Sequence, residues 1–309
     1  MMTRFGLTVS LAAGLLVTWA ARAAEDNAKF PRELVNFAPH GSKPVFTAAD
    51  KGAWDAKIRE RGWIMKEDGV YKLWYTGYDG SKEGRRMLGY ATSPDGITWT
   101  RHPKNPLVHD LWVEDMMVVK HDGKYYMFAE GENDRAQLLV SLDGLAWTPQ
   151  GKLDIRKKNG QPIADGAYGT PTAWHENGRW HLFYERNDLG VWLATSADMK
   201  VWTNVRDEPV LTPGPGAYDK DLIALNQIVK HKGRYYAYYH GSAKTGPDAK
   251  KWSTGVATST DLIRWEKYPG NPLFPVAANK SSGIVVPDGS AFRLYTMHPE
   301  VYLHVQPKK

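Results

Sequence analysis

The sequence predicts an all-β protein made of five similar units, and three repeated features support that prediction. A tight-turn dipeptide recurs at a nearly constant interval, so that the turn glycines 69, 123, 178, 233 and 289 are separated by 54, 55, 55 and 56 residues. An aromatic-rich segment follows each turn, as in YKLWYTG, KYYMFAEG and RYYAYYHG. The first four units also share the pattern S-x-D-x-x-x-W. A period this regular indicates an array of similar structural units.

Each unit is expected to contain four strands in a fixed order. An inner strand precedes the turn and the aromatic-rich second strand follows it, because dipeptides such as Asp-Gly and Asn-Gly favour hairpins. A third strand, such as AQLLVS or GVWLAT, leads into the S-x-D-x-x-x-W pattern, whose Ser and Asp favour a turn and whose Trp covers the sheet. A short outer strand completes the unit. Five such four-stranded antiparallel units predict a five-bladed β-propeller.

The fifth unit is shorter than the others. It lacks the S-x-D-x-x-x-W pattern, and the chain ends soon after its second or third strand. We therefore expect the segment 30–46 to supply the missing outer strand and close the ring. No Pro/Ser-rich linker divides the chain, so we expect residues 24–309 to form a single propeller domain that carries the catalytic site.

The N-terminal segment 1–23 has the pattern of a secretory signal peptide. A basic residue, Arg4, is followed by an apolar run over residues 5–20 and by a small-residue stretch over residues 21–23. A membrane helix is the alternative, but the run falls short of the roughly 20 residues that a span needs. We expect a mature protein that starts near Ala24, is secreted or periplasmic, and has no membrane span once the signal has been removed.

The composition favours a carbohydrate partner over nucleic acid. The formal charge of +6 comes from lysines and arginines that are scattered among acids rather than gathered in a stripe. The chain has 13 Trp and 16 Tyr, and aromatic rings stack well on the apolar C–H faces of sugars. It has no cysteine, no cluster with zinc-ligand spacing and no phosphate-binding or dinucleotide-binding loop. We therefore expect neither a metal nor a cofactor.

Acidic residues are predicted to gather at one mouth of the central channel. The inner strand of each blade lines the channel, and it leaves the face to which the second strand returns. Counted from the turn glycine, Glu60 and Glu114 share one position on the inner strand, while Glu130 and Glu185 share another at the end of the second strand. Crowded carboxylates cost stability through repulsion and desolvation, so a functional role is the natural explanation. These four are the predicted catalytic residues, because two carboxyls in different environments can act as acid and base.

Other side chains near the same mouth are predicted to bind the substrate. They are acids, aromatic residues and one histidine in or beside the loops that enter this face: Trp54, Asp55, Trp112, Asp115, Asp165, Tyr168, Asp221 and His240. The structural alternative is a ring of ion pairs in which Arg59, Arg61, Arg186 and Lys280 neutralise the acids. In that alternative the aromatic residues belong to the core.

Taken together, these features resemble the five-bladed propeller glycosidases of glycoside hydrolase families 43, 32 and 130. The likeness covers essentially the whole mature chain and rests on stretches such as DGVYKLWYTG, LGYATSPDGITW, NPLV and YGTPTAWHENGRWHLFYE. In family 43 an acid opens the inner strand of each of the first three blades, and the three serve as general base, modulator and general acid. The resemblance places the first role on Glu60 and the second on Glu114. The third falls on Gly169, so Glu185 or Glu130 is expected to replace it.

The pair Glu114-Asp115 is similar to the Glu-Asp element of the family 130 mannoside phosphorylases and hydrolases. In that family Pro-Arg follows the pair, whereas Met116-Met117 follows it here. The missing arginine weakens the case for phosphate as a co-substrate. Only one side chain of the pair is expected to face the channel, and the match with Glu60 favours Glu114.

The sequence therefore predicts a glycoside hydrolase that cleaves a poly- or oligosaccharide outside the cytoplasm. Two alternatives stay open. A non-catalytic carbohydrate-binding propeller is consistent with the absent third acid at Gly169, and a phosphorylase is consistent with the Glu114-Asp115 pair. Glu130 and Glu185 favour chemistry over binding alone.

Overall fold

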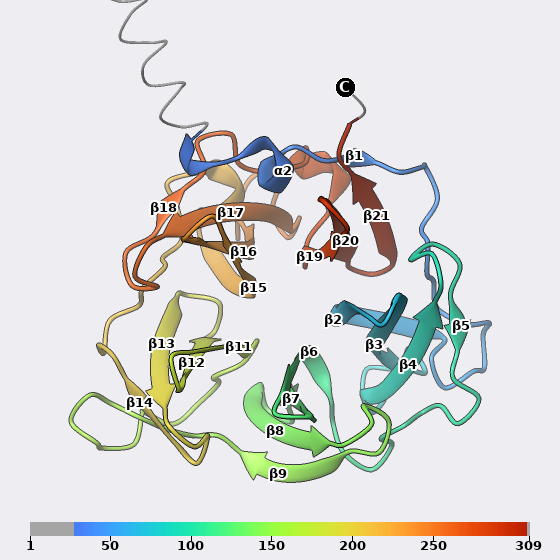
Figure 1. The fold of residues 1–309 in the computed structure, drawn as a ribbon, viewed down its shortest axis with the longest axis horizontal. Coiled ribbons are helices and arrows are strands. Elements are labelled where there is room, and N and C mark those ends of the chain that lie inside the picture. Colours follow the sequence, from blue (N-terminus) through green and yellow to red (C-terminus); the bar gives the residue numbers. More distant parts are fainter. Residues whose placement is uncertain (1–27, 308–309) are drawn as a thin grey trace, which may run out of the picture.

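The computed structural model describes residues 28–307, and these form five β-sheets arranged in a ring (Figure 1). The predicted signal peptide lies outside the described residues. Each sheet is one blade, and the strand at one edge of it lies next to the central channel. The prediction of an all-β, five-bladed propeller is confirmed. In the described part of the chain, no helix is long and apolar enough to cross a membrane.

The strands of the five blades follow one another in chain order. Blade 1 contains β2 (Lys57–Glu67), β3 (Val70–Tyr78), β4 (Met87–Ser93) and β5 (Thr100–Arg101). Blade 2 contains β6 (Glu114–His121), β7 (Lys124–Gly131), β8 (Arg135–Ser141) and β9 (Thr148–Lys152). Blade 3 contains β11 (Thr172–Glu176), β12 (Arg179–Glu185), β13 (Val191–Ser196) and β14 (Val201–Asn204). Blade 4 contains β15 (Leu222–His231), β16 (Arg234–Ser242), β17 (Ser253–Ser259) and β18 (Glu266–Lys267).

Blade 5 is built from both ends of the described chain. It contains β19 (Ile284–Asp288), β20 (Ala291–Met297) and β21 (Val301–Val305), and β1 (Ala38–Pro39) pairs with the outer edge of β21. The pairing is antiparallel, with Ala38 opposite Val305. The short helix α2 (Arg32–Val35) precedes β1, and its Leu34 is fully buried. The expected closure of the ring by the segment 30–46 is therefore present.

Blade 3 differs from the prediction in one respect. A short strand, β10 (Asp154–Arg156), pairs in parallel with β14 and makes this sheet five-stranded. A strand of 3 residues is too short to show a repeat in the sequence. Short helical segments also lie in the connections, among them two 3-10 turns at Ala217–Asp219 and Val276–Ala278.

The hydrophobic core lies between neighbouring blades, where aromatic side chains of adjacent sheets pack together. Trp74 of blade 1 is fully buried, and its ring centroid lies 6.2 Å from that of Tyr125 and 6.5 Å from that of Trp147, both in blade 2. Trp147 closes an S-x-D-x-x-x-W turn. Within that turn the Asp143 carboxylate accepts backbone hydrogen bonds from Leu145 and Ala146, each at 2.8 Å. The pattern has the structural role expected from the sequence.

The inner strands of blades 1, 2 and 4 each contain a β-bulge near their first residues. The ladder shifts between Arg59 and Trp63 in β2 and between Glu114 and Met117 in β6. The bulge of β2 holds one residue more than that of β6, so Glu114 corresponds to Arg59 and Asp115 corresponds to Glu60. Both Glu60 (φ 49°) and Asp115 (φ 45°) have the left-handed backbone conformation, which non-glycine residues rarely adopt. The bulges thus turn these two acids toward the channel mouth.

Candidate active site

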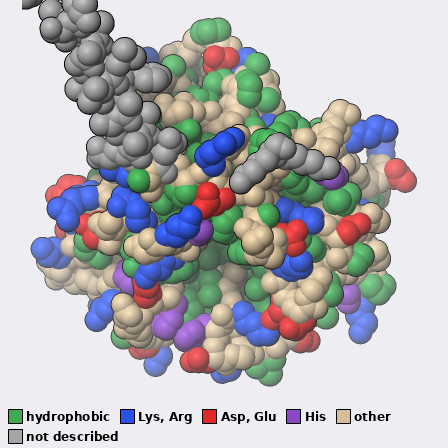
Figure 2. All heavy atoms as spheres, turned by 45° about the horizontal axis from the view of Figure 1, so that its top comes forward, with side chains coloured by type: hydrophobic (Ala, Val, Ile, Leu, Met, Phe, Trp, Pro, Cys, Tyr) green, Lys and Arg blue, Asp and Glu red, His purple; other side chains and the backbone are tan. Residues whose placement is uncertain are grey.

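A cavity of about 320 Å³ opens at the mouth of the channel where the inner strands begin. All five blades or their loops contribute to its wall. The acids on the wall are Glu60, Asp115, Glu130, Asp134, Glu185 and Asp188, and the other lining residues are Arg59, Ala167, Thr170, Asn187, His240, Trp252, Ser281 and Ser282. On the face shown in Figure 2, by contrast, Lys and Arg side chains are interspersed with Asp and Glu. That face does not share the excess of acids that lines the cavity.

Glu130 and Glu185 meet at the segment Gly169-Thr170, which precedes the inner strand of blade 3. The backbone N–H of Thr170 donates to Glu130 Oε2 at 2.9 Å, and that of Gly169 donates to Glu185 Oε1 at 3.0 Å. The N–H of Asp188 donates to the other oxygen of Glu185. A Cβ atom on residue 169 would lie 2.1 Å from Glu130 Oε2 and 2.8 Å from Glu185 Oε1. The two glutamates therefore occupy the space that a side chain at position 169 would need.

Both glutamates are buried without a cation of their own. In the described part of the chain, neither forms an ion pair within 4.0 Å, although both have relative exposures below 10% (7% for Glu130 and 5% for Glu185). Burial raises the pKa of Glu130 well above its usual value, and the charges of Asp115 and Glu114 act in the same direction. Burial also raises the pKa of Glu185, against the effect of its two backbone hydrogen bonds. In both side chains burial thus shifts the pKa toward the protonated form.

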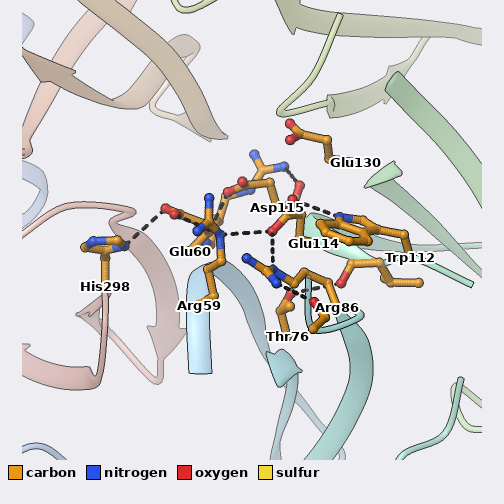
Figure 3. A network of polar contacts seen from close by, with 12 residues as sticks. Arg59, Glu60, Thr76, Arg86, Trp112, Glu114, Asp115, Glu130 and His298 are labelled. Atoms are coloured by element: carbon orange, nitrogen blue, oxygen red, sulfur yellow. Dashed lines mark hydrogen bonds and ion pairs between the residues drawn. The ribbon is translucent and has the colours of Figure 1, made fainter. Parts of the chain in front are cut away.

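Glu60 has the opposite electrostatic setting (Figure 3). Its carboxylate lies 3.2 Å from Arg59 Nε and 3.1 Å from Nδ1 of His298, which follows β20 in blade 5. Burial alone would raise the pKa of Glu60, but the contact with His298 and the charges of His298 and Arg59 lower it to about 2. One cavity thus contains a carboxylate with a lowered pKa beside carboxyls whose pKa values are raised.

Asp115, rather than Glu114, lines the cavity. The backbone N–H of Arg61 donates to Asp115 Oδ1 at 3.1 Å. Burial raises the pKa of Asp115 well above its usual value, and the charge of Glu60 raises it further. Glu114 lies behind the wall, where it accepts hydrogen bonds from Trp112 Nε1 at 2.8 Å and Arg59 Nε at 3.1 Å (Figure 3). The expectation that Glu114 faces the channel was wrong, because the longer bulge of β2 shifts the match by one residue.

His240 lines the cavity from blade 4, as expected. Its Nδ1 lies 2.7 Å from Asn226 Oδ1, and its ring meets Trp252 edge to face with centroids 5.0 Å apart. Burial lowers the pKa of His240 to about 3, so the imidazole is neutral near neutral pH. His240 is therefore suited to hydrogen bonding with substrate hydroxyls rather than to carrying charge.

Asp55 and Trp54 lie outside the cavity, in contrast to the expectation. The Asp55 carboxylate accepts hydrogen bonds from Tyr75 at 2.9 Å and Arg101 Nε at 2.8 Å, and Trp54 stacks on Tyr75. Blade 4 repeats the arrangement around Asp219, whose partners are Lys267 at 2.5 Å and Tyr239 at 3.3 Å. The repetition in a second blade identifies these clusters as structural.

The remaining predicted binding residues also lie off the cavity wall. Asp165 and Tyr168 line a smaller cavity of about 180 Å³ beside it, bounded by β10 and the loop before β11. Asp221 accepts the backbone N–H of Lys244 at 2.8 Å. Trp112 binds Glu114, as described above. The alternative of a neutralising ion-pair ring fits Glu60 and Glu114, which contact Arg59, but not Glu130 or Glu185.

Several cavity residues were missed in the sequence. Asp134 and Asp188 occupy hairpin turns that follow Glu130 and Glu185, and both have positive φ (53° and 57°). A signal for them was available, because each glutamate is followed within four residues by the dipeptide Asn-Asp. Trp252 also lines the cavity, and His298 contacts Glu60 without lining it; both come from loops between strands, where the repeat predicts no position.

One set of carboxylates is close enough to hold a cation. Within the described residues, ligand atoms of Glu114, Glu130 and Asp134 all lie within 4.8 Å of one another. The oxygen-only donor set would suit a hard cation such as Ca²⁺ or Mg²⁺. Two of these residues are at the cavity wall, so the cluster is part of the same acidic site.

The fold and the acidic cavity together define a class, the five-bladed propellers with the architecture of glycosidases. A candidate glycosidase from Bacteroides thetaiotaomicron superposes with a TM-score of 0.75 at 19% identity, covering 91% of this chain and 100% of that one. A structure reported for glycoside hydrolase family 130, whose mannoside phosphorylases include hydrolases that target β-1,2 mannosidic linkages in Candida mannan, superposes with a TM-score of 0.71. It is 20% identical and is matched over 88% of this chain and 94% of its own.

Sequence comparison leads to the same group. The chain is 26% identical over 218 residues to a 1,2-beta-oligomannan phosphorylase from Thermoanaerobacter sp., a match that covers 65% of this chain and 70% of the phosphorylase. No family model matches the chain. The resemblance to the propeller glycosidases seen in the sequence therefore extends to their fold.

Proposed function

We propose that this protein is a glycoside hydrolase that cleaves glycosidic bonds in an oligo- or polysaccharide. The observation that carries the proposal is the cavity in which Glu130 and Glu185 lie on the Gly169-Thr170 amides opposite the ionised Glu60. Cleavage of a glycosidic bond needs a carboxyl to protonate the leaving oxygen and a carboxylate to assist on the other side.

Glu185 and Glu130 are the candidates for proton donor. Burial and the neighbouring acids raise the pKa of both, which is the direction that a proton donor at neutral pH requires. They also fill the place where a third-blade acid would project from residue 169. The absent acid is thus replaced by two side chains that reach the same place from the ends of β7 and β12.

Glu60 is the candidate for the ionised partner. Its contacts with Arg59 and His298 keep it charged, as its pKa of about 2 requires. A fixed negative charge in a buried site stabilises the positive, oxocarbenium-like sugar ring in the transition state, and it can orient the attacking water. Asp115 beside it takes the blade 2 position that the sequence assigned to Glu114.

Hydrolysis is favoured over phosphorolysis by the charge of the cavity. Six carboxyl side chains line it, whereas Arg59 is its one lysine or arginine among the described residues. That arginine already contacts Glu60 and Glu114. A phosphate dianion would have to enter against this field, while water would not. The second candidate, a phosphorylase, is supported by the similarity to the oligomannan phosphorylase.

The first substrates to test are β-1,2-linked manno-oligosaccharides, because two of the similar proteins are described with such linkages. The purified protein is incubated with them, and with a panel of other oligosaccharides, in buffer with and without phosphate. We expect free sugars at the same rate in both buffers. Sugar 1-phosphate formed only with phosphate would establish the phosphorylase instead. Tight binding without any cleavage would establish a binding propeller.

The proposal places the enzyme in the periplasm or outside the cell, on the basis of the segment 1–23. The test is fractionation of cells that express the full chain, followed by N-terminal sequencing. We expect a mature N-terminus near Ala24 in the exported fraction. A cytoplasmic protein that retains Met1 would contradict the location without affecting the proposed chemistry.

A further inference from the structure

The side chain of Arg61 lies in the middle of the channel, directly under the acidic cavity. It is fully buried, and it comes from the bulge of β2 that also carries Glu60. Past it, toward the other end of the inner strands, lies a second and mostly apolar cavity of about 320 Å³ whose wall includes Trp63, Met117 and Trp174. Arg61 lines neither cavity itself, but it contacts Asp115 of the acidic cavity wall.

The guanidinium of Arg61 binds three other blades. Nη1 donates to Thr172 Oγ1 at 2.7 Å and to the carbonyls of Leu225 at 3.0 Å and Asn226 at 3.1 Å. Nη2 donates to the carbonyl of Pro171 at 2.8 Å and to that of Asp115. In the described residues Arg61 forms no ion pair within 4.0 Å, so its partners are oxygen dipoles rather than carboxylates.

Three of these acceptor residues are linked to the cavity wall. Asp115 itself lines the cavity from blade 2. Pro171 directly follows the Gly169-Thr170 amides that hold Glu185 and Glu130. Asn226 of blade 4 binds His240 through its side chain. Arg61 is thus in contact with the backbone that sets the position of every acid in the proposed reaction.

We propose that Arg61 is a positioning residue that fixes the spacing between the proton-donating glutamates and Glu60. It does not touch the substrate, and it acts through the Asp115 backbone and the strand that follows Gly169-Thr170. The inference rests on the proposed hydrolysis. It extends that function by naming the group that holds the cavity residues of four blades in register.

An apolar side chain would be the ordinary choice for this place. The corresponding residue in blade 2 is Met116, which is fully buried. A buried cation is costly, and burial lowers the pKa of Arg61 to about 10. The planar guanidinium offers five donors in a fixed fork, whereas lysine offers a point charge on a flexible chain. The guanidinium can therefore hold three blades at once, whereas a lysine ammonium group cannot.

Two variants test the proposal, Arg61→Lys and Arg61→Met, with Arg101→Lys as the matched control. Arg101 is the cation that pairs with Asp55 in blade 1, and Lys267 pairs with Asp219 in the same way in blade 4. We expect Arg61→Lys to remain folded and to lose kcat by ~10² with little change in KM, because small misplacements of reacting groups cost that much. Arg101→Lys should keep the kcat of the wild type. An unchanged kcat in Arg61→Lys would overturn the proposal.

The pH profile separates positioning from a merely structural role. The charge of Arg61 lowers the pKa of Asp115 and interacts with Glu130. Its loss in Arg61→Met should therefore move the alkaline limb of the kcat profile to higher pH. Loss of activity in proportion to loss of folded protein, with both limbs unchanged, would contradict the proposal. Should Arg61→Met fail to fold, Arg61→Lys decides the outcome.

A crystal structure of Arg61→Lys tests the inference even when no substrate is cleaved. We expect the Thr170 N–H to move out of hydrogen-bond distance of Glu130 Oε2, which is 2.9 Å in the wild type. An unmoved Gly169-Thr170 segment would overturn the positioning role. A wild type without activity but with the expected displacement would count against the hydrolase and in favour of the positioning role.

Discussion

Buried carboxylates occur in two settings in this propeller. Asp55 and Asp219, in blades 1 and 4, each have a cation and a tyrosine hydroxyl as partners. Glu130 and Glu185 are similarly buried in the cavity, but their hydrogen bonds come from backbone amides and their neighbours are other acids. A cation compensates the charge of a buried carboxylate, whereas nearby acids favour protonation. The first setting stabilises the fold, whereas the second raises the carboxyl pKa, as the proposed role of proton donor requires.

The largest expected effect is that of Glu185→Gln on turnover. On an oligosaccharide with a poor leaving group, loss of a general acid should reduce kcat by ~10²–10⁴, and much less on an activated aryl glycoside. The unfolding free energy should fall slightly, because the Gln amide has one oxygen and cannot accept both the Gly169 and the Asp188 backbone N–H. Kinetics on both substrate types, with the exposed Glu132→Gln as control, measure the difference. Glu130→Gln receives the same test.

Equal losses on the two substrate types in both variants would exclude the proton-donor role. Normal turnover in both would leave Glu130 and Glu185 a binding or structural part. Either result would remove the distinction between the two settings of buried acid.

Asp219→Asn should lower the unfolding free energy and leave turnover unchanged. Lys267, whose side chain is 16% exposed, would lose its carboxylate partner, and breaking a buried pair costs about 3–5 kcal/mol. Asp55→Asn should cost less, because the side chain of Arg101 is 35% exposed and water can replace the partner. Urea unfolding gives the free energies, and kcat per folded molecule should stay unchanged. A fall in kcat at full stability would instead place these clusters within the site.

Gly169→Ala tests whether the glutamates need the empty position at residue 169. The new Cβ would lie 2.1 Å from Glu130 Oε2, so one or both carboxylates must move. A displacement of reacting groups on this scale is worth ~10² in kcat, about 2.7 kcal/mol of activation energy. Gly41→Ala, where nothing lies within 4 Å, is the control. Full activity of Gly169→Ala would show that neither glutamate has to occupy this place.

The smallest effect is a pH-dependent gain in stability from Asp188→Asn. Burial and the charges of Glu185 and Glu60 raise the pKa of Asp188 to about 7. A raised carboxyl pKa favours the folded state below pH 4 and disfavours it as pH rises through 7. The variant should therefore be about 1 kcal/mol more stable than wild type at pH 8 and equal to it at pH 4, allowing for partial exposure. A difference that is the same at both pH values would contradict the raised pKa.

The fold was predictable because the repeat is carried by turns and aromatic strands of nearly constant length. Glu130 and Glu185 were located correctly for the same reason, since no bulge separates them from the turn glycine. The preference for Glu114 over Asp115 as the channel-facing residue was wrong because the bulges of β2 and β6 differ by one residue, and one residue reverses the direction of a side chain.

Other errors have different physical causes. Asp55 was predicted to bind the substrate because the sequence does not reveal its ion pair with Arg101. An acid that is paired with a cation cannot be told from an unpaired one by sequence position alone. Trp252 and His298 come from loops whose lengths vary between blades, so counting from the turn glycines could not place them. Asp134 and Asp188 follow their glutamates in a repeated Asn-Asp dipeptide, and that signal was overlooked.

The closure of the ring in blade 5 bears on how the chain is made. Because β1 pairs with β21, the ring cannot close until residue 305 has been synthesised, although all strands of the first four blades lie between residues 57 and 267. A growing chain therefore keeps an open edge on each side of the gap until its end is reached.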